Sequence, residues 1–302
     1  EKSLSEIISA YPDYKEKIHY QNGGIYPSVS DTEEIEISYQ EIINYDAVAS
    51  SVRYTSTPLI AIIDTGIDID HPDFDSSIIS PLSYNVSEKV TVSEGGLEVI
   101  DDKVGHGTEV AGIMAASHDN QGINGVCGKP KLLIIKLTQN EKGGFDDGDI
   151  ILAIDYAVEN GAKLINMSFS SVGYEYNPFA DVLRRERKND VICVAASGND
   201  GTVALSYPAA DPNVIGVGSV DNITLELASY SNYGENIDVV APGTYLTTSL
   251  HGGYKIVSGT SYSAPVVTSL LALGLGKENY KDFYLETSDG EIPIGLYSAC
   301  TD

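Results

Sequence analysis

The chain has 302 residues, of which 42% are hydrophobic, and its formal net charge at pH 7 is −26. No apolar run approaches the roughly 20 residues of a membrane-spanning helix, so the composition predicts a globular protein with one large domain or two small ones. The negative charge argues against a nucleic-acid partner, and the three widely spaced cysteines show no metal-binding or redox pattern.

The first 38 residues differ in character from the rest of the chain. Ser3 and Glu6 have the spacing of a capping box, which predicts a short helix, and Tyr, Glu and Ser dominate afterwards. We therefore expect residues 1–38 to be an N-terminal extension, either a leftover linker or a strap across the body. No signal peptide is visible after Glu1, and the sequence leaves the compartment open between secreted and cytoplasmic.

From Pro58 onward, apolar runs alternate with helical patterns. The runs are continuous, as in strands buried on both faces, and occupy residues 59–63, 132–137, 164–169, 191–196, 214–220 and 237–240. Residues 149–159 and 179–188 have helical periodicity. This alternation predicts an α/β fold with a mainly parallel central sheet and helices on both faces. In such sheets the site lies beyond the carboxyl ends of the strands, where Asp64, Ser168 and Asn199 fall.

Ser261 precedes a helical pattern that has Pro265 in its first turn, where proline is tolerated. At a helix N-terminus the free backbone N–H groups and the helix dipole favour negative charge, so Ser261 is a candidate nucleophile. The same position suits a serine that only caps the helix, and for an isolated Ser-Ala-Pro that interpretation is the commoner one.

Two other side chains complete a candidate catalytic set. His106 lies between two glycines just before an apolar helical segment, and Asp64 follows the hydrophobic run 59–63. Alone, His106 is consistent with a surface or core histidine, and Asp64 with a turn former. Together with Ser261 they are the hydroxyl, imidazole and carboxylate that nucleophilic serine catalysis requires, in one of the few known chain orders.

The motifs around these residues resemble the three signatures of the subtilisin family of serine proteases. They are Ile63-Asp-Thr-Gly-Ile67, Gly105-His-Gly-Thr108 with Val110-Ala-Gly112, and Gly259-Thr-Ser261 with Ala264-Pro265. Further matching segments extend the resemblance from about Tyr39 to Leu275. The resemblance implies a three-layer subtilisin-like fold and an endopeptidase that works through an acyl-enzyme intermediate. It also makes residues 39–302 the peptidase domain and residues 1–38 a possible remnant of the pro-region.

By this resemblance Ser261 is the nucleophile, His106 is the general base, and Asp64 is the carboxylate that orients His106. Asn199 matches the oxyanion-hole amide, which acts with the backbone N–H of Ser261; without the other motifs it would be taken for a turn asparagine. Two departures lie close to these motifs. Glu109 stands where the family usually has a second histidine, and Tyr262 with Ser263 replaces the commoner Met-Ala. We expect catalysis to survive both changes.

The resemblance also implies that a peptide binds as an extended strand, with a pocket for P1, the residue before the scissile bond. The matching positions are Ser168, Phe169, Ser170, Ala195, Ala196, Ser197 and Ser206, of which the last is the pocket floor. Ser170 and Ser197 replace the glycine and alanine common in the family, which predicts a narrower or more polar pocket. No aligned position offers a carboxylate, so we expect a neutral P1 side chain, hydrophobic or aromatic.

A structural calcium site is the one cofactor that the resemblance suggests, and none is expected for catalysis. Its matching positions are Asp73, Asp119, Gln121 and Ile123, where carboxylates and loop carbonyls would surround the ion. The alternative is an Asn/Gly-rich turn that binds no metal.

Two other functions stay open at this stage. One is a pseudoprotease that keeps the fold as a binding module, although all four catalytic positions are filled. The other is a processing protease dedicated to one peptide. If the protein is a protease, whether general or dedicated to one peptide, we expect a monomer that acts on a peptide or protein. We expect no nucleic-acid partner and no membrane span. At the C-terminus, Gly295-Leu-Tyr297 resembles the start of the family's last helix.

Overall fold

The computed structural model describes residues 57–119, 121–138, 144–172, 176–203, 206–274, 280–287 and 290–297, together with Ile43. The predicted extension, residues 1–38, lies outside the described residues. Within the described part of the chain, no helix is both long enough and apolar enough to cross a membrane.

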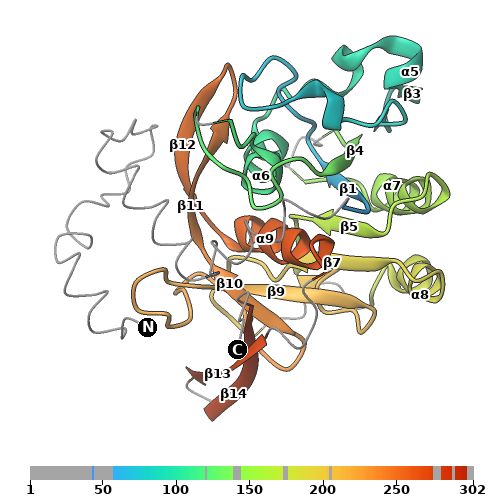
Figure 1. Ribbon diagram of the computed structural model, residues 1–302. Helices are drawn as coiled ribbons and strands as arrows, with labels where there is room; N and C mark the ends of the chain where they lie inside the picture. The colour runs from blue at the N-terminus through green and yellow to red at the C-terminus, as the bar shows by residue number, and fades with distance from the viewer. Residues whose placement is uncertain are drawn as a thin grey trace.

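A ten-stranded sheet forms the centre of the protein (Figure 1). In spatial order its strands are β13 (Tyr280–Thr287), β14 (Gly290–Tyr297), β10 (Val239–Pro242), β9 (Val214–Val220), β7 (Ile192–Ala196), β5 (Leu164–Met167), β1 (Leu59–Asp64), β4 (Lys131–Lys136), β2 (Tyr84–Asn85) and β3 (Val90–Thr91). Every neighbouring pair from β14 to β2 is parallel, and the antiparallel pairs are at the two edges. The predicted mainly parallel sheet is therefore confirmed.

The apolar runs become strands because both faces of the sheet are covered, as β1 illustrates. Ile60 and Ile62 pack into one hydrophobic cluster, whereas Ala61 and Ile63 pack into a second one on the opposite face. The helices of the first cluster are α6 (His106–Ala115) and α9 (Thr260–Ala272), and those of the second are α7 (Asp147–Glu159) and α8 (Ala180–Lys188). The helix–sheet–helix layers visible in Figure 1 confirm the predicted α/β architecture.

Several shorter elements lie outside the main sheet and the four long helices. They are α5 (Val92–Gly95), the 3-10 turns η1 (Ser76–Ile78) and η2 (Leu97–Ile100), the hairpin of β11 (Thr244–Ser249) with β12 (Gly253–Ser258), and the pair β6 (Ser171–Val172) with β8 (Ser206–Tyr207). The hairpin is fastened to α6, since the Thr247 and Thr248 hydroxyls donate to the carbonyls of Glu109 and Thr108 at 2.6 and 2.8 Å. These bonds attach β11 to the helix that His106 begins.

The expectation of a helix beginning near Gly295 is wrong, because this segment belongs to β14. Val239 and Val240 of β10 pair with Gly295 and Leu296, so β14 occupies the edge that β10 would otherwise expose. Unpaired backbone groups at a sheet edge need hydrogen-bond partners, and a hairpin supplies them here. The Asp289-Gly290 dipeptide is the hairpin signal that could have predicted this element.

Candidate active site

Asp64 and His106 are joined by a two-point hydrogen bond at the carboxyl end of β1. Asp64 ends that strand and is 1% exposed, and His106 is the first residue of α6. The imidazole Nδ1 lies 2.8 Å from Asp64 Oδ1 and 3.0 Å from Oδ2. A carboxylate can only accept, so Nδ1 carries a proton and Nε2 of the neutral ring is left as the basic nitrogen.

Gly107 makes this close approach between strand and helix possible. A Cβ on Gly107 would lie 2.2 Å from the Gly66 carbonyl oxygen, well inside contact distance. The Gly107 N–H also donates to the Thr65 hydroxyl at 2.8 Å, which secures the helix start against the end of β1. The sequence Gly-His-Gly is therefore a packing requirement, because a side chain at Gly107 would push His106 away from Asp64.

The protonated form of His106 is stabilised despite its enclosed position. Burial disfavours the charged ring, but the charge and hydrogen bond of Asp64 outweigh burial, and the charges of Glu109 and Asp102 add to them. The pKa of His106 is consequently raised to about 9. Stabilisation of an imidazolium is what a general base requires after it has taken a proton.

Ser261 occupies the first turn of α9, whose N-cap is Gly259. The backbone carbonyl of Ser261 accepts from the Ser168 hydroxyl at 2.7 Å. Behind it, the Asn166 amide donates to Ser168 Oγ at 2.9 Å and accepts from the Thr268 hydroxyl at 2.9 Å. This chain of buried polar groups ties α9 to the end of β5 and fixes the serine beneath the cleft.

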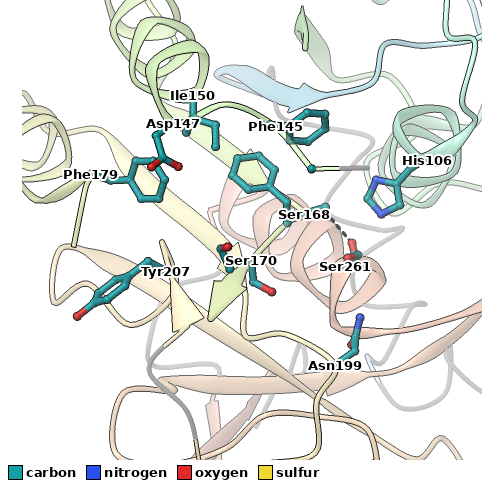
Figure 2. Close-up of a pocket in the computed structure, with 13 residues that line it drawn as sticks. His106, Phe145, Asp147, Ile150, Ser168, Ser170, Phe179, Asn199, Tyr207 and Ser261 are labelled. Carbon is teal, nitrogen blue, oxygen red and sulfur yellow. Dashed lines mark hydrogen bonds between the residues drawn. The ribbon is translucent and has the colours of Figure 1, made fainter. Parts of the chain in front are cut away.

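Asn199 follows β7 and is oriented by α9. Its side-chain oxygen accepts from the Thr260 N–H at 2.9 Å and from the Thr260 hydroxyl at 3.0 Å. With the oxygen held in this way, the amide nitrogen faces the region of Ser261, as Figure 2 shows. The site therefore has a side-chain N–H donor next to the serine, where an oxyanion hole would need it.

His106, Asn199 and Ser261 all line one cleft of about 300 Å³ (Figure 2). Among the hydrogen bonds of the described residues, none joins the Ser261 hydroxyl to His106, although both residues line the cleft. Catalytic hydrogen bonds are commonly long in free enzymes and tighten when substrate binds. The three predicted motifs are thus brought together around one space large enough for part of a peptide.

The predicted substrate-binding residues divide into two groups. Ser168, Phe169 and Ser170 line the cleft, as predicted. Ala195, Ala196, Ser197 and Ser206 are buried and are not among the residues that line it. Among the described residues the buried Ser206 hydroxyl has no hydrogen-bond partner. A Cβ on Gly198 would lie 2.9 Å from Ser170 Oγ and 3.1 Å from Ser206 Oγ, so this position needs glycine.

Sequence reasoning missed the aromatic part of the cleft. The additional lining residues include Phe145, Asp147, Ile150, Phe179 and Tyr207. The rings of Phe145 and Phe169 meet edge to face at 5.3 Å, and Asp147 is the acidic group in this lining. Asp147 and Ile150 lie in the first turn of α7, Phe179 is the N-cap of α8, and Tyr207 ends β8. No motif in the sequence marks these residues as part of the site.

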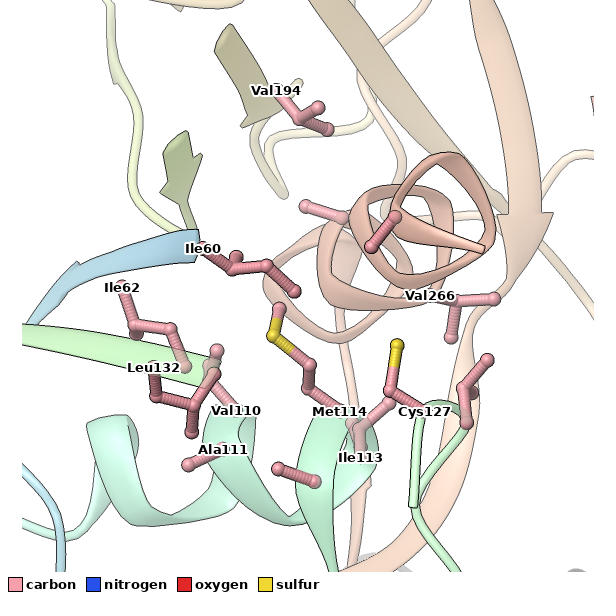
Figure 3. Close-up of a cluster of buried hydrophobic side chains, with 14 of the residues drawn as sticks. Ile60, Ile62, Val110, Ala111, Ile113, Met114, Cys127, Leu132, Val194 and Val266 are labelled. Atoms are coloured by element: carbon pink, nitrogen blue, oxygen red, sulfur yellow. The ribbon is translucent and has the colours of Figure 1, made fainter. Parts of the chain in front are cut away.

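The two helices that begin at the site are anchored in the same core. Val110 and Met114 of α6 pack with Val266 of α9 and with Ile60 and Ile62 of β1 (Figure 3). Each fully buried apolar side chain contributes about 1.5–3 kcal/mol relative to an exposed one. His106 and Ser261 are therefore held by one rigid cluster, which limits their relative movement.

Two of the predicted calcium ligands, Asp73 and Asp119, accept hydrogen bonds from protein donors. Asp73 Oδ2 accepts from the Ile123 N–H at 3.0 Å, and the Tyr254 hydroxyl hydrogen-bonds the same carboxylate. Asp119 Oδ1 accepts from the Gln121 N–H at 2.9 Å within its own turn. Ca²⁺ needs roughly 6–8 oxygen ligands, whereas N–H and O–H donors occupy this carboxylate. Within the described ranges, no three acidic, His or Cys side chains are grouped so that they could hold a metal ion.

Comparisons with known proteins agree with this geometry. The sequence model of the subtilase family, Peptidase_S8, matches residues 55–289. The major intracellular serine protease of Bacillus subtilis (strain 168) is 38% identical over 240 residues, which cover 77% of this chain and 72% of that protein.

Two solved structures are also similar. The prenylagaramide maturation protease PagA has a TM-score of 0.63 and 28% identity, covering 76% of this chain and 78% of that one. The epidermin leader peptide processing serine protease EpiP from Staphylococcus aureus has a TM-score of 0.68 and 25% identity, covering 83% of this chain and 72% of that one.

Proposed function

Since the chain belongs to the subtilase family of serine proteases, we propose that it hydrolyses peptide bonds through an acyl-enzyme intermediate on Ser261. The protein is a subtilisin-like serine endopeptidase, and its substrate is a peptide or protein. The observation that supports the detailed mechanism is the two-point bond of His106 to Asp64 at a cleft that Ser261 and Asn199 share.

We infer the roles of the four residues from the family resemblance, and their geometry supports them. His106 Nε2 takes the proton of the Ser261 hydroxyl as the oxygen attacks the scissile carbonyl carbon, and the Asp64 carboxylate stabilises the resulting imidazolium. The carbonyl oxygen becomes negative and is met by the Asn199 side-chain N–H and the Ser261 backbone N–H. His106 then protonates the leaving amine, and water releases the acyl group by the reverse sequence.

The cleft favours a neutral residue at P1. Of the positions matched to the P1 pocket, Ser170 lines the cleft and offers a hydroxyl group, whereas Ser197 and Ser206 are buried and do not line it. None of the three is a carboxylate, which a buried lysine or arginine would need as its partner. The adjoining Phe169 and Phe145 offer apolar surface to other parts of the peptide.

A second candidate is a processing protease that removes a leader from one dedicated peptide. PagA and EpiP are named for maturation and leader-peptide processing. The acidic Asp147 among aromatic lining residues supports selection of a particular sequence over general digestion. This candidate concerns the substrate only, because the chemistry on Ser261 is the same.

Labelling with a fluorophosphonate probe tests the mechanism. The wild-type protein should be modified at Ser261 as shown by mass spectrometry, whereas Ser261→Ala should not be labelled. Absence of labelling in folded wild-type protein would favour the binding-module alternative. A peptide library then tests specificity: a P1 optimum at Lys or Arg would contradict the neutral pocket, and cleavage at many unrelated sites would contradict a dedicated processing role.

A further inference from the structure

Two residues that depart from the usual subtilisin pattern, Glu109 and Tyr262, are bonded to each other beside the catalytic histidine. The Tyr262 hydroxyl donates to Glu109 Oε2 at 2.6 Å, and the Lys255 ammonium lies 2.5 Å from Oε1. Glu109 is only 5% exposed, so a hydroxyl and an ammonium of the protein hold a buried carboxylate between them. The two departures therefore belong to one side-chain cluster.

This cluster connects the nucleophile with the base. Tyr262 directly follows Ser261 in α9, and Glu109 lies three residues after His106 in α6. The rings of His106 and Tyr262 are in contact, with centroids 5.7 Å apart and an interplanar angle of 47°. The Tyr262–Glu109 bond thus ties together the first turns of the two helices that carry the reacting groups.

Several charged groups surround the imidazole. Asp64, Asp102 and Glu109 contribute negative charge, Lys255 is paired with Glu109, and Asp147 lines the same cleft. The effect of Asp64 is fixed by its direct bond to Nδ1, and Asp102 accepts hydrogen bonds from three backbone N–H groups and a hydroxyl. Glu109 is paired with a cation, Lys255, so the charge of either partner can be removed separately.

Tyr262 stays protonated in this setting. Burial of its hydroxyl and the charge and hydrogen bond of Glu109 all raise the pKa of Tyr262. The hydroxyl is therefore a permanent donor to Glu109 over the working pH range, and the bond does not switch with pH.

We propose that Glu109, Tyr262 and Lys255 form a positioning unit for the catalytic pair. In this unit the Tyr262–Glu109 bond fixes Ser261 relative to His106, and the Glu109–Lys255 ion pair adjusts the electrostatic environment of the imidazole, which Asp64 dominates. None of the three touches the reacting atoms, so they act through His106 and Ser261. The inference deepens the proposed function and rests on His106 acting as the general base.

Removing the negative charge of Glu109 or the positive charge of Lys255 tests whether the ion pair affects the imidazole. Glu109→Gln keeps an acceptor for Tyr262 but removes the negative charge, so the acid limb of the kcat/KM pH profile should move down by about 0.5 unit, about a threefold gain at pH 7. Lys255→Met removes the compensating cation and should move the limb up by about the same amount. The double variant should return close to the wild-type profile.

Removing the Tyr262 hydroxyl tests whether its bond to Glu109 positions Ser261 relative to His106. Tyr262→Phe keeps the ring against His106 but breaks the bond to Glu109, and kcat should fall about three- to tenfold with KM unchanged. Tyr254→Phe is the matched control, because that hydroxyl also bonds a carboxylate, Asp73, away from the cleft. For the charge change, the control is Glu186→Gln, a 2% exposed glutamate of α8 bonded to Arg185 and Asn189.

The rate of fluorophosphonate labelling at Ser261, measured from pH 6 to 10, gives a readout without a peptide substrate. If the wild-type protein is not labelled, both the proposed function and this inference are wrong. If it is labelled but Lys255→Met and Glu109→Gln have the same acid limb as the wild type, only this inference is wrong. Lys255 is 44% exposed, so its variant should remain folded and decide the question even if Glu109→Gln lowers the Tm.

Discussion

The side-chain oxygen of Asn199 accepts two hydrogen bonds from Thr260, one from the backbone N–H and one from the hydroxyl. Because the oxygen and nitrogen of an amide point away from each other on one planar group, this double contact directs the nitrogen toward the cleft (Figure 2). The residue before the proposed nucleophile thus orients the proposed oxyanion donor.

Replacement of Asn199 by alanine should reduce kcat by about 10²–10³ with little change in KM, a range that comes from an oxyanion-hole asparagine of another subtilisin. The donor is needed most in the transition state, so ground-state binding is spared. Steady-state kinetics on a cleavable peptide measure the effect. Thr260→Val should give a smaller loss of kcat, since it removes only the hydroxyl. A rise in the KM of Asn199→Ala as large as its fall in kcat would contradict an oxyanion role for Asn199.

The proposed catalytic triad could be predicted from the sequence because each of its residues lies in a contiguous motif with local physical demands. The 2.2 Å approach of a Gly107 Cβ to Gly66 explains why glycine must follow His106, and the first turn of α9 explains Pro265 after Ser261. The sheet and its covering helices could also be predicted from the sequence, since strands buried on both faces are continuous apolar runs.

What the sequence could not predict depends on contacts between distant positions. Glu109 and Tyr262 are 153 residues apart, and nothing near either residue indicates that the two bond. The calcium prediction relied on a loop of the right length, and it could not indicate that the Ile123 N–H and the distant Tyr254 hydroxyl donate to the Asp73 carboxylate. Loop length alone carries no information about such donors.

Replacement of Gly107 by alanine should inactivate the enzyme and lower its stability by about 1–3 kcal/mol. The new methyl group would meet the Gly66 backbone, so the first turn of α6 must move and His106 must leave Asp64. Thermal unfolding and peptide hydrolysis measure the two effects. Gly148→Ala, in α7 with open space around its Cβ, is the control and should retain full activity.

Activity and stability should respond to pH in opposite directions between about pH 6.5 and 9. The His106 pKa is raised from 6.5 to about 9, so the neutral ring that acts as a base accumulates only as the pH rises through that range, and kcat/KM should rise with it. A raised folded-state pKa contributes stability that is fully present below the unfolded pKa and is lost as the pH rises through the folded one.

This pH dependence is checked by kcat/KM profiles and by chemical unfolding at several pH values. Asp64→Asn removes the charge that raises the pKa and should lower kcat by about 10⁴ while flattening the stability change in this window. An acid limb near pH 6.5 in the wild-type enzyme would contradict the raised pKa.

Removal of divalent metal should leave the stability of the described fold unchanged, because protein donors occupy the Asp73 carboxylate. We expect EDTA to shift the Tm by less than about 1 °C, whereas Tyr254→Phe should lower it by several degrees, since losing a hydrogen bond to a charged group costs about 1.5–3 kcal/mol. Gly122→Ala should lower the Tm further, because Gly122 has φ +58° and an added Cβ would lie 2.1 Å from Asp73 Oδ1. Differential scanning calorimetry measures the Tm with EDTA and in both variants. A large Tm loss in EDTA that added Ca²⁺ restores would show that calcium stabilises the protein despite this hydrogen-bonded arrangement.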